Sequence, residues 1–118
     1  MHPHEDLEVL ANAAIHGVVL PKAESPEHIR FAAERVGSGS VIMPLIESAR
    51  GYAEVGSLCA AMQVQRLVFG SIDFQLDLGI DGEGDELLYF RSGLVLASRL
   101  AGIQPPVDGV TVEINDAE

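Results

Sequence analysis

The chain has 118 residues, which is enough for one domain, and 47% of them are hydrophobic, so a core of aliphatic side chains can form without tryptophan. Seven basic and eighteen acidic residues give a formal charge of −11, which argues against nucleic acid or an anionic membrane as a partner. The single cysteine permits no intrachain disulfide, and neither a signal peptide nor an apolar run of about 20 residues is visible. We therefore expect a cytoplasmic protein.

The first half of the chain predicts two helices and two short strands. Leucine and alanine at helical spacing predict a helix over Pro3–Ala14 that stops at Gly17. Val18–Leu20 predicts a buried strand, and Ser25 with the following proline predicts the start of a helix that ends near Val36. The apolar run Val41–Ile46 predicts the next strand.

The second half continues the alternation. Tyr52–Met62 predicts a helix, Leu67–Gly70 a strand, and Phe74–Gly84 an exposed connection rich in glycine and aspartate. Asp85–Ala101 predicts a long amphipathic helix, and Val107–Ile114 a last strand.

Strands that alternate with helices predict parallel pairing with right-handed crossovers, and short apolar strands fit a sheet that is buried on both faces. The fold class is therefore α/β over residues 1–118. Four such units amount to half of a (β/α)₈ barrel, which typically needs about 250 residues. A small flavodoxin-like sheet is the alternative, although no strand is followed by a glycine-rich phosphate loop.

Charged side chains stand near the ends of these strands. Lys22, Glu47 and Asp73 follow three of them, and Asp108 lies near the start of the last. Because the carboxyl ends of parallel strands share one edge, the first three can converge. Two carboxylates suit Mg²⁺, which would polarise a carbonyl and stabilise an enolate. Helix caps or salt bridges are the alternative roles for these acids, and a salt bridge to an acid at a strand end is the alternative role for Lys22.

Five collinear segments resemble the citrate lyase β-subunit family, part of the HpcH/HpaI aldolase group. They are GVVLPKAESPEHI at Gly17–Ile29, PLIESARG at Pro44–Gly51, VFGSIDFQLDLG at Val68–Gly79, LLYFRSGLVLASRLAGI at Leu87–Ile103 and VDGVTVEIND at Val107–Asp116. The resemblance implies a TIM barrel that cleaves or forms carbon–carbon bonds of acyl-CoA or 2-oxo acids with Mg²⁺ or Mn²⁺. It also implies a homo-oligomer.

The resemblance extends to single residues. Glu47 and Asp73 match the two metal carboxylates of the family. Gly70 and Ser71 match a turn that approaches the substrate, and Lys22 matches the lysine of the family's L-P-K segment. The same comparison matches Asp108 to a recurrent acid of the penultimate strand, which implies either a structural role or a place in the acyl-carrier cleft.

The chain resembles only the fourth to seventh strands of that barrel, without the family's substrate-binding arginine. We therefore expect a truncated domain with two unpaired parallel edges. The implied function is Mg²⁺-dependent cleavage of citryl-CoA-like or malyl-CoA-like substrates to acetyl-CoA and an oxo-acid. The alternative is a catalytically silent fragment or an interaction protein.

Overall fold

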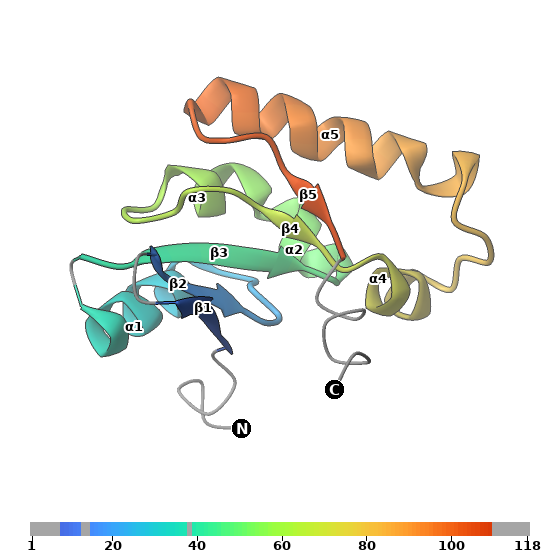
Figure 1. Ribbon diagram of the computed structural model, residues 1–118. Helices are drawn as coiled ribbons and strands as arrows, with labels where there is room; N and C mark the ends of the chain where they lie inside the picture. Colours follow the sequence, from blue (N-terminus) through green and yellow to red (C-terminus); the bar gives the residue numbers. More distant parts are fainter. Residues whose placement is uncertain (1–7, 13–14, 38, 110–118) are drawn as a thin grey trace.

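A single five-stranded sheet organises the computed structural model, which describes residues 8–12, 15–37 and 39–109 (Figure 1). The strands follow one another across the sheet in chain order. They are β1 (Glu8–Asn12), β2 (Ile15–Leu20), β3 (Val41–Ile46), β4 (Val68–Phe69) and β5 (Val107–Asp108). Strands β2 to β5 pair in parallel, whereas β1 is antiparallel to β2. The predicted parallel α/β arrangement is therefore confirmed.

Five helices connect the strands: α1 (Pro26–Val36), α2 (Ala49–Ala53), α3 (Val55–Ala60), α4 (Ser71–Leu78) and α5 (Asp85–Ala101). Helix α1 begins where predicted, because the Ser25 hydroxyl accepts a hydrogen bond from the His28 amide at 3.3 Å. Helix α5 ends where Gly102 adopts a left-handed φ of 75°, a conformation that glycine takes without strain.

The two faces of the sheet carry separate apolar clusters. One face packs against the helices through Ile42, Ile46 and Phe69, which meet buried side chains of α1, α3, α4 and α5. The other face carries a smaller cluster of Val19, Met43 and Val68. Because side chains alternate between the two faces along a strand, β3 and β4 bury apolar residues on both faces, as the sequence predicted.

The predicted helix over Pro3–Ala14 is wrong where the structure describes it, because Glu8–Asn12 is strand β1. Its partner strand, β2, begins at Ile15, whereas the predicted strand began at Val18. Gly17, which was predicted to stop the helix, lies within β2 opposite Leu10. Backbone pairing between adjacent segments has overridden the helical spacing of the leucines. Strand β1 therefore covers the β2 edge, which the sequence analysis expected to be unpaired.

Three further boundaries differ. The predicted Tyr52–Met62 helix is two short helices that meet at Glu54, where φ is −98° and ψ is 11°. Helix α4 occupies the start of the predicted connection, and Gly79 ends it with a φ of 72°. Of the last predicted strand, residues 110–114 lie outside the described part of the chain. Within the described ranges, no helix combines the length and the apolar character needed to cross a membrane.

Candidate functional site

A cavity of about 330 Å³ lies beyond the carboxyl ends of β2 and β3, against α4. Parallel pairing brings these ends together, since Leu20 stands opposite Pro44 and Ile46 opposite Phe69. Four carboxylates, one lysine, a serine and a leucine line the cavity: Lys22, Glu24, Glu47, Ser48, Asp73, Leu76 and Asp77. Three of the residues that the sequence placed at strand ends therefore share one cavity.

Glu47 is the innermost of these acids. It follows β3 directly and is only 7% exposed. The main-chain amide of Lys22 donates a hydrogen bond to Glu47 Oε2 at 2.8 Å. Burial, followed by a side-chain hydrogen bond with Asp73, raises the pKa of Glu47 to about 7, although the Lys22 amide opposes this shift. The carboxylate therefore sits in surroundings that disfavour its charge.

Asp73 stands in the first turn of α4, where the helix dipole favours a negative side chain. Its side chain is exposed and lies in the same cavity as Glu47, close enough to help raise the pKa of the Glu47 carboxyl group. The structure thus brings together the two acids that the sequence analysis matched to a metal site.

Glu24 and Asp77 also line the cavity, and the sequence analysis did not single them out. The Ser48 hydroxyl donates a hydrogen bond to Glu24 Oε2 at 2.7 Å, and the Ala49 amide donates one to Asp77 Oδ2 at 2.8 Å. Asp77 follows Asp73 by four residues on one face of α4. The spacing was visible in the sequence, but its meaning depended on a helix that was not predicted.

Gly70, the residue between β4 and α4, packs against Glu47. A β-carbon at Gly70 would stand 3.1 Å from Glu47 Cβ and 3.4 Å from Glu47 Oε1. The absence of a side chain therefore leaves room for the Glu47 carboxyl group. Ser71 is the first residue of α4 and is half-buried. Neither Gly70 nor Ser71 lines the cavity itself.

Lys22 contributes an exposed side chain and, among the described residues that line the cavity, the only cation. Its predicted alternative role was a salt bridge to an acid at a strand end. Among the ion pairs of the described residues, none involves Lys22. Its ammonium group is thus placed beside the acids without a direct pairing to one of them.

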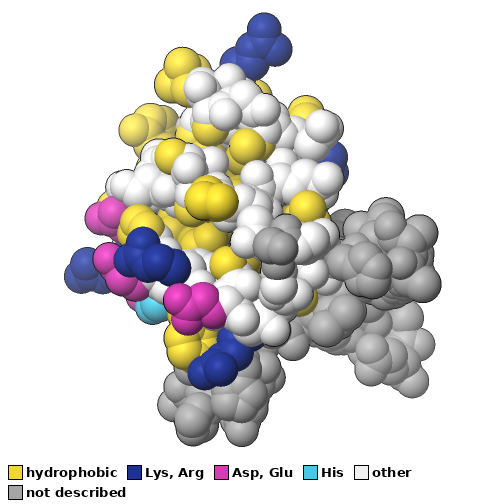
Figure 2. Space-filling view, turned by 90° about the vertical axis from the view of Figure 1, so that its left-hand side faces the viewer, with side chains coloured by type: hydrophobic (Ala, Val, Ile, Leu, Met, Phe, Trp, Pro, Cys, Tyr) yellow, Lys and Arg dark blue, Asp and Glu magenta, His cyan; other side chains and the backbone are white. Residues whose placement is uncertain are grey.

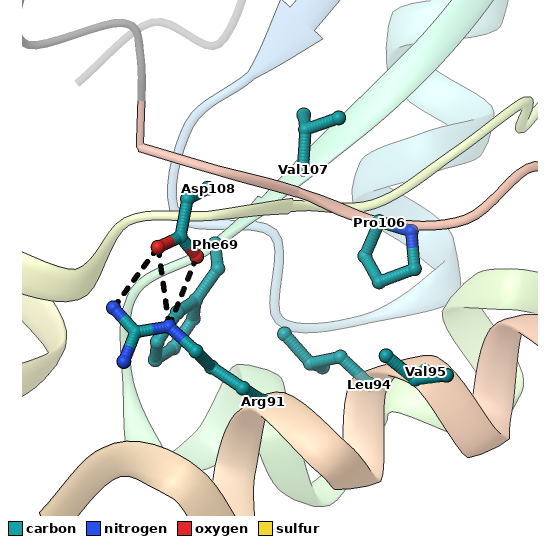
Figure 3. A pocket seen from close by; sticks show the side chains of 7 residues that line it. All are labelled: Phe69, Arg91, Leu94, Val95, Pro106, Val107 and Asp108. Atoms are coloured by element: carbon teal, nitrogen blue, oxygen red, sulfur yellow. Dashed lines mark hydrogen bonds and ion pairs between the residues drawn. The ribbon is translucent and has the colours of Figure 1, made fainter. Parts of the chain in front are cut away.

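Asp108 lies apart from this cavity, in a second one of about 240 Å³ between α5 and β5 (Figure 3). The Arg91 guanidinium binds its carboxylate at 3.0 Å, donates a hydrogen bond to the Glu83 carbonyl and stacks over the Phe69 ring. These contacts tie β5 to α5 and to the loop before it. The structure therefore gives Asp108 a structural partner and does not group it with Glu47 and Asp73.

An apolar groove of about 450 Å³ lies between α1 and α3, away from the acids, lined among others by Ile29, Ala33 and Met62. Figure 2 looks onto this end of the molecule, where hydrophobic side chains gather between scattered charged ones. The groove contains none of the residues that the sequence analysis proposed for a site.

Comparison with curated proteins finds relatives over nearly the whole chain. A citrate lyase subunit beta-like protein of Deinococcus radiodurans is 34% identical over 97% of this chain. The mitochondrial citramalyl-CoA lyase of Homo sapiens is 25% identical over 95% of it. The chain spans only 41% and 39% of the length of these two relatives.

Solved structures of the same kind of protein also superpose on this chain. RipC from Yersinia pestis superposes with a TM-score of 0.72 at 33% identity, over 78% of this chain and 43% of that one. The citrate lyase beta subunit from M. tuberculosis, complexed with oxaloacetate and magnesium, gives 0.65 at 26% identity, over 78% and 42%. The same organism's CitE, in complex with magnesium, acetoacetate and coenzyme A, gives 0.66, also at 26% identity, over 78% and 35%.

Four parallel strands with intervening helices, superposed on citrate lyase beta subunits, make this structure part of a TIM barrel. The relatives include citrate lyase-like proteins and lyases of CoA esters. Residues 2–118 match the family described as HpcH/HpaI aldolase/citrate lyase. The chain therefore belongs to the HpcH/HpaI aldolase/citrate lyase family.

Proposed function

We propose that this chain carries the divalent-metal portion of a carbon–carbon lyase site that acts on CoA esters such as citryl-CoA or malyl-CoA. The observation that carries the proposal is the contact between the Glu47 and Asp73 carboxyl groups in one cavity at the carboxyl edge of the sheet. Ligands of parallel α/β folds bind at this edge. The products would be acetyl-CoA and an oxo-acid.

The donor set of the cavity fits a hard divalent cation. Two carboxylates so close to one another repel when both are ionised, and a cation between them would remove that repulsion. Within the described ranges, no group of three or more histidine, cysteine, aspartate or glutamate side chains could hold a metal. Glu47 and Asp73 would therefore hold Mg²⁺ as a pair, since Mg²⁺ commonly binds one or two carboxylates and keeps several waters.

The chemistry that bound Mg²⁺ supplies in such a site is polarisation of a carbonyl oxygen and stabilisation of an enolate. The protein's own contribution is placement. The Lys22 amide and Gly70 fix the Glu47 carboxyl group from two sides, and the Lys22 ammonium offers a positive charge to a substrate carboxylate. We assign Lys22, Gly70 and Ser71 to the substrate side of the site, whereas the Arg91 contacts favour a structural role for Asp108.

Calorimetric titration of the chain with Mg²⁺ tests the proposal. The unmodified chain is expected to bind, and Glu47→Gln or Asp73→Asn is expected to weaken binding at least tenfold, because each removes one ligand charge. Glu34→Gln is the matched control, since Glu34 is exposed on α1 and does not line the cavity. Unchanged Mg²⁺ affinity in both site variants would contradict the assignment.

Cleavage of citryl-CoA and malyl-CoA by the same preparations tests the catalytic part. If the chain contains enough of the site, the unmodified chain is expected to release acetyl-CoA, and Glu47→Gln and Asp73→Asn are expected to release less. Mg²⁺ binding without cleavage of either ester would instead favour the alternative function, a metal-binding protein that does not catalyse the reaction by itself.

A further inference from the structure

Lys22 has an unusual backbone conformation. Its φ of 50° lies in the left-handed region, which only one other non-glycine residue of the described chain, Gln63, also enters. A side chain with a β-carbon is strained there, whereas glycine adopts the same angles freely. Strain of this kind persists where the surrounding structure requires it, and it concentrates at functional sites.

The left-handed turn has a visible consequence at Glu47. It sets the angle between two successive amides, so that the Lys22 amide bonds Glu47 Oε2 at 2.8 Å while the Ala23 amide bonds the Leu45 carbonyl at 3.3 Å. The chain leaving β2 is thus fastened across the end of β3. The other carboxylate oxygen, Oε1, lies on the side of Gly70, and the Glu47 carboxyl group as a whole stands next to Asp73.

We propose that Lys22 is a positioning residue whose left-handed backbone places its amide on Glu47 Oε2 and so fixes the Glu47 carboxyl group for a bound divalent cation. This inference rests on the proposed function, which it deepens. The backbone and the ammonium group of Lys22 then have separate tasks. The amide orients a metal ligand, and the side chain remains free to meet an anionic substrate.

Because the two tasks are separate, substitutions can distinguish them. Lys22→Gly keeps the left-handed turn and the amide but removes the ammonium group, whereas Lys22→Val opposes a positive φ because valine is β-branched. Lys22→Arg keeps the charge and imposes no new demand on the backbone. The three variants are compared by their dissociation constants for Mg²⁺ and by their thermal midpoints without metal.

Lys22→Gly and Lys22→Arg are expected to bind Mg²⁺ within about threefold of the unmodified chain, and Lys22→Gly is expected to have a higher thermal midpoint because the strain is gone. Lys22→Val is expected to bind at least about tenfold more weakly while circular dichroism shows it folded. A merely structural role would change midpoints and leave the dissociation constants alone. Equal Mg²⁺ affinity in Lys22→Val, or equal losses in Lys22→Val and Lys22→Gly, would overturn the proposal.

A second measurement covers the cases in which Lys22→Val does not fold or the unmodified chain binds no Mg²⁺. The amide-proton resonance of Lys22 is expected to shift in Glu47→Gln, because its acceptor changes from a carboxyl to an amide group. A resonance that does not move would refute the positioning role. Absence of Mg²⁺ binding together with a moving resonance would refute the proposed function while leaving the Lys22–Glu47 contact in place.

Discussion

At the scale of single residues, the site is defined by a carboxyl group in an unfavourable place. Glu47 is 7% exposed and lies against a second acid, so its ionised form loses water without gaining a partner of opposite charge among the described ion pairs. A pKa of about 7 for Glu47 follows from that environment. A fold optimised for stability alone would place a neutral side chain here. The cost of burying Glu47 therefore favours a role in ligand binding.

Glu47→Gln is expected to stabilise the metal-free chain at alkaline pH. The folded-state pKa of Glu47 is raised from 4.5 to about 7, so its contribution to stability is complete below pH 4.5 and is lost as the pH rises through 7. Glutamine does not ionise, so the variant keeps that contribution, about 3 kcal/mol in the free energy of unfolding, most of which falls between about pH 5 and about pH 8. Urea unfolding with a chelator at about pH 5 and about pH 8 measures it.

The control is Glu34→Gln, an exposed acid outside the cavity, for which no comparable difference is expected. A Glu47→Gln variant that gains nothing at the higher pH relative to the lower one would show that the Glu47 pKa is not raised in the metal-free protein.

The sequence predicted Glu47 and Asp73 because each follows a short apolar run, and parallel strands place such residues at one edge. It did not predict Glu24 and Asp77, whose positions depend on Ser48 and on α4. Hydrogen bonds from a side chain to a group distant in sequence leave no periodic signal in the chain. The separation of Asp108 from the cavity was invisible for the same reason, since it depends on Arg91.

At the scale of elements, α1 and α5 were predicted with nearly the right ends because local signals define them. Ser25 caps α1, and Gly102 ends α5. The break between α2 and α3 at Glu54 has no proline to announce it, and the nearest glycines, Gly51 and Gly56, lie inside the two helices. Helix α4 was missed because its apolar residues stand at every second position, so no stripe at helical spacing marks a buried face, and of them only Phe74 is buried.

Helix α5 makes a close approach to α2 that a single methyl group should disturb. A β-carbon at Gly93 would collide with the Tyr52 hydroxyl, and the Tyr52 ring packs edge-on against Phe90 at 5.2 Å between centroids. Gly93→Ala is therefore expected to lower the free energy of unfolding by about 1 to 2 kcal/mol, although alanine favours a helix. Chemical denaturation measures this change.

The matched control is Gly56→Ala in α3, where a β-carbon meets no atom within 4 Å and a gain in stability is expected. In a Tyr52→Phe background the Gly93→Ala loss should shrink by at least about 0.5 kcal/mol, because the colliding hydroxyl is gone. Equal losses in the two backgrounds would place the cause elsewhere.

At the scale of the whole molecule, the order and parallel pairing of β2 to β5 followed from alternation in the sequence, whereas β1 did not. The leucines at 7 and 10 and the alanine at 14 fit a helix, and only the neighbouring strand β2 gives Glu8–Asn12 an extended partner. Strand β1 protects one edge of the sheet, and β5 forms the other edge of the described sheet. The shape is that of an arc of a barrel, with α5 along its outer side (Figure 1).

Helix α5 also carries an unusual share of the exposed apolar surface. Among its exposed side chains are Tyr89 at 71%, Leu96 at 61% and Leu100 at 78%, with Leu88 and Val95 on a neighbouring face. A helix that is apolar on several faces is normally covered on several faces. We therefore expect the isolated chain to self-associate through α5, despite a net charge of −11 that opposes contact between copies.

Sedimentation velocity over a range of concentrations measures this association against the 12.6 kDa mass of one chain. Val95→Gln with Leu96→Gln is expected to shift the distribution toward the monomer without changing the charge. Met62→Gln is the matched control, because Met62 is 81% exposed but lies in the groove between α1 and α3. A chain that stays monomeric throughout, or a control that dissociates it equally, would show that α5 is not the surface that copies share. Raising the salt concentration should strengthen association through α5, because screening weakens the repulsion between acidic copies while leaving apolar contact intact.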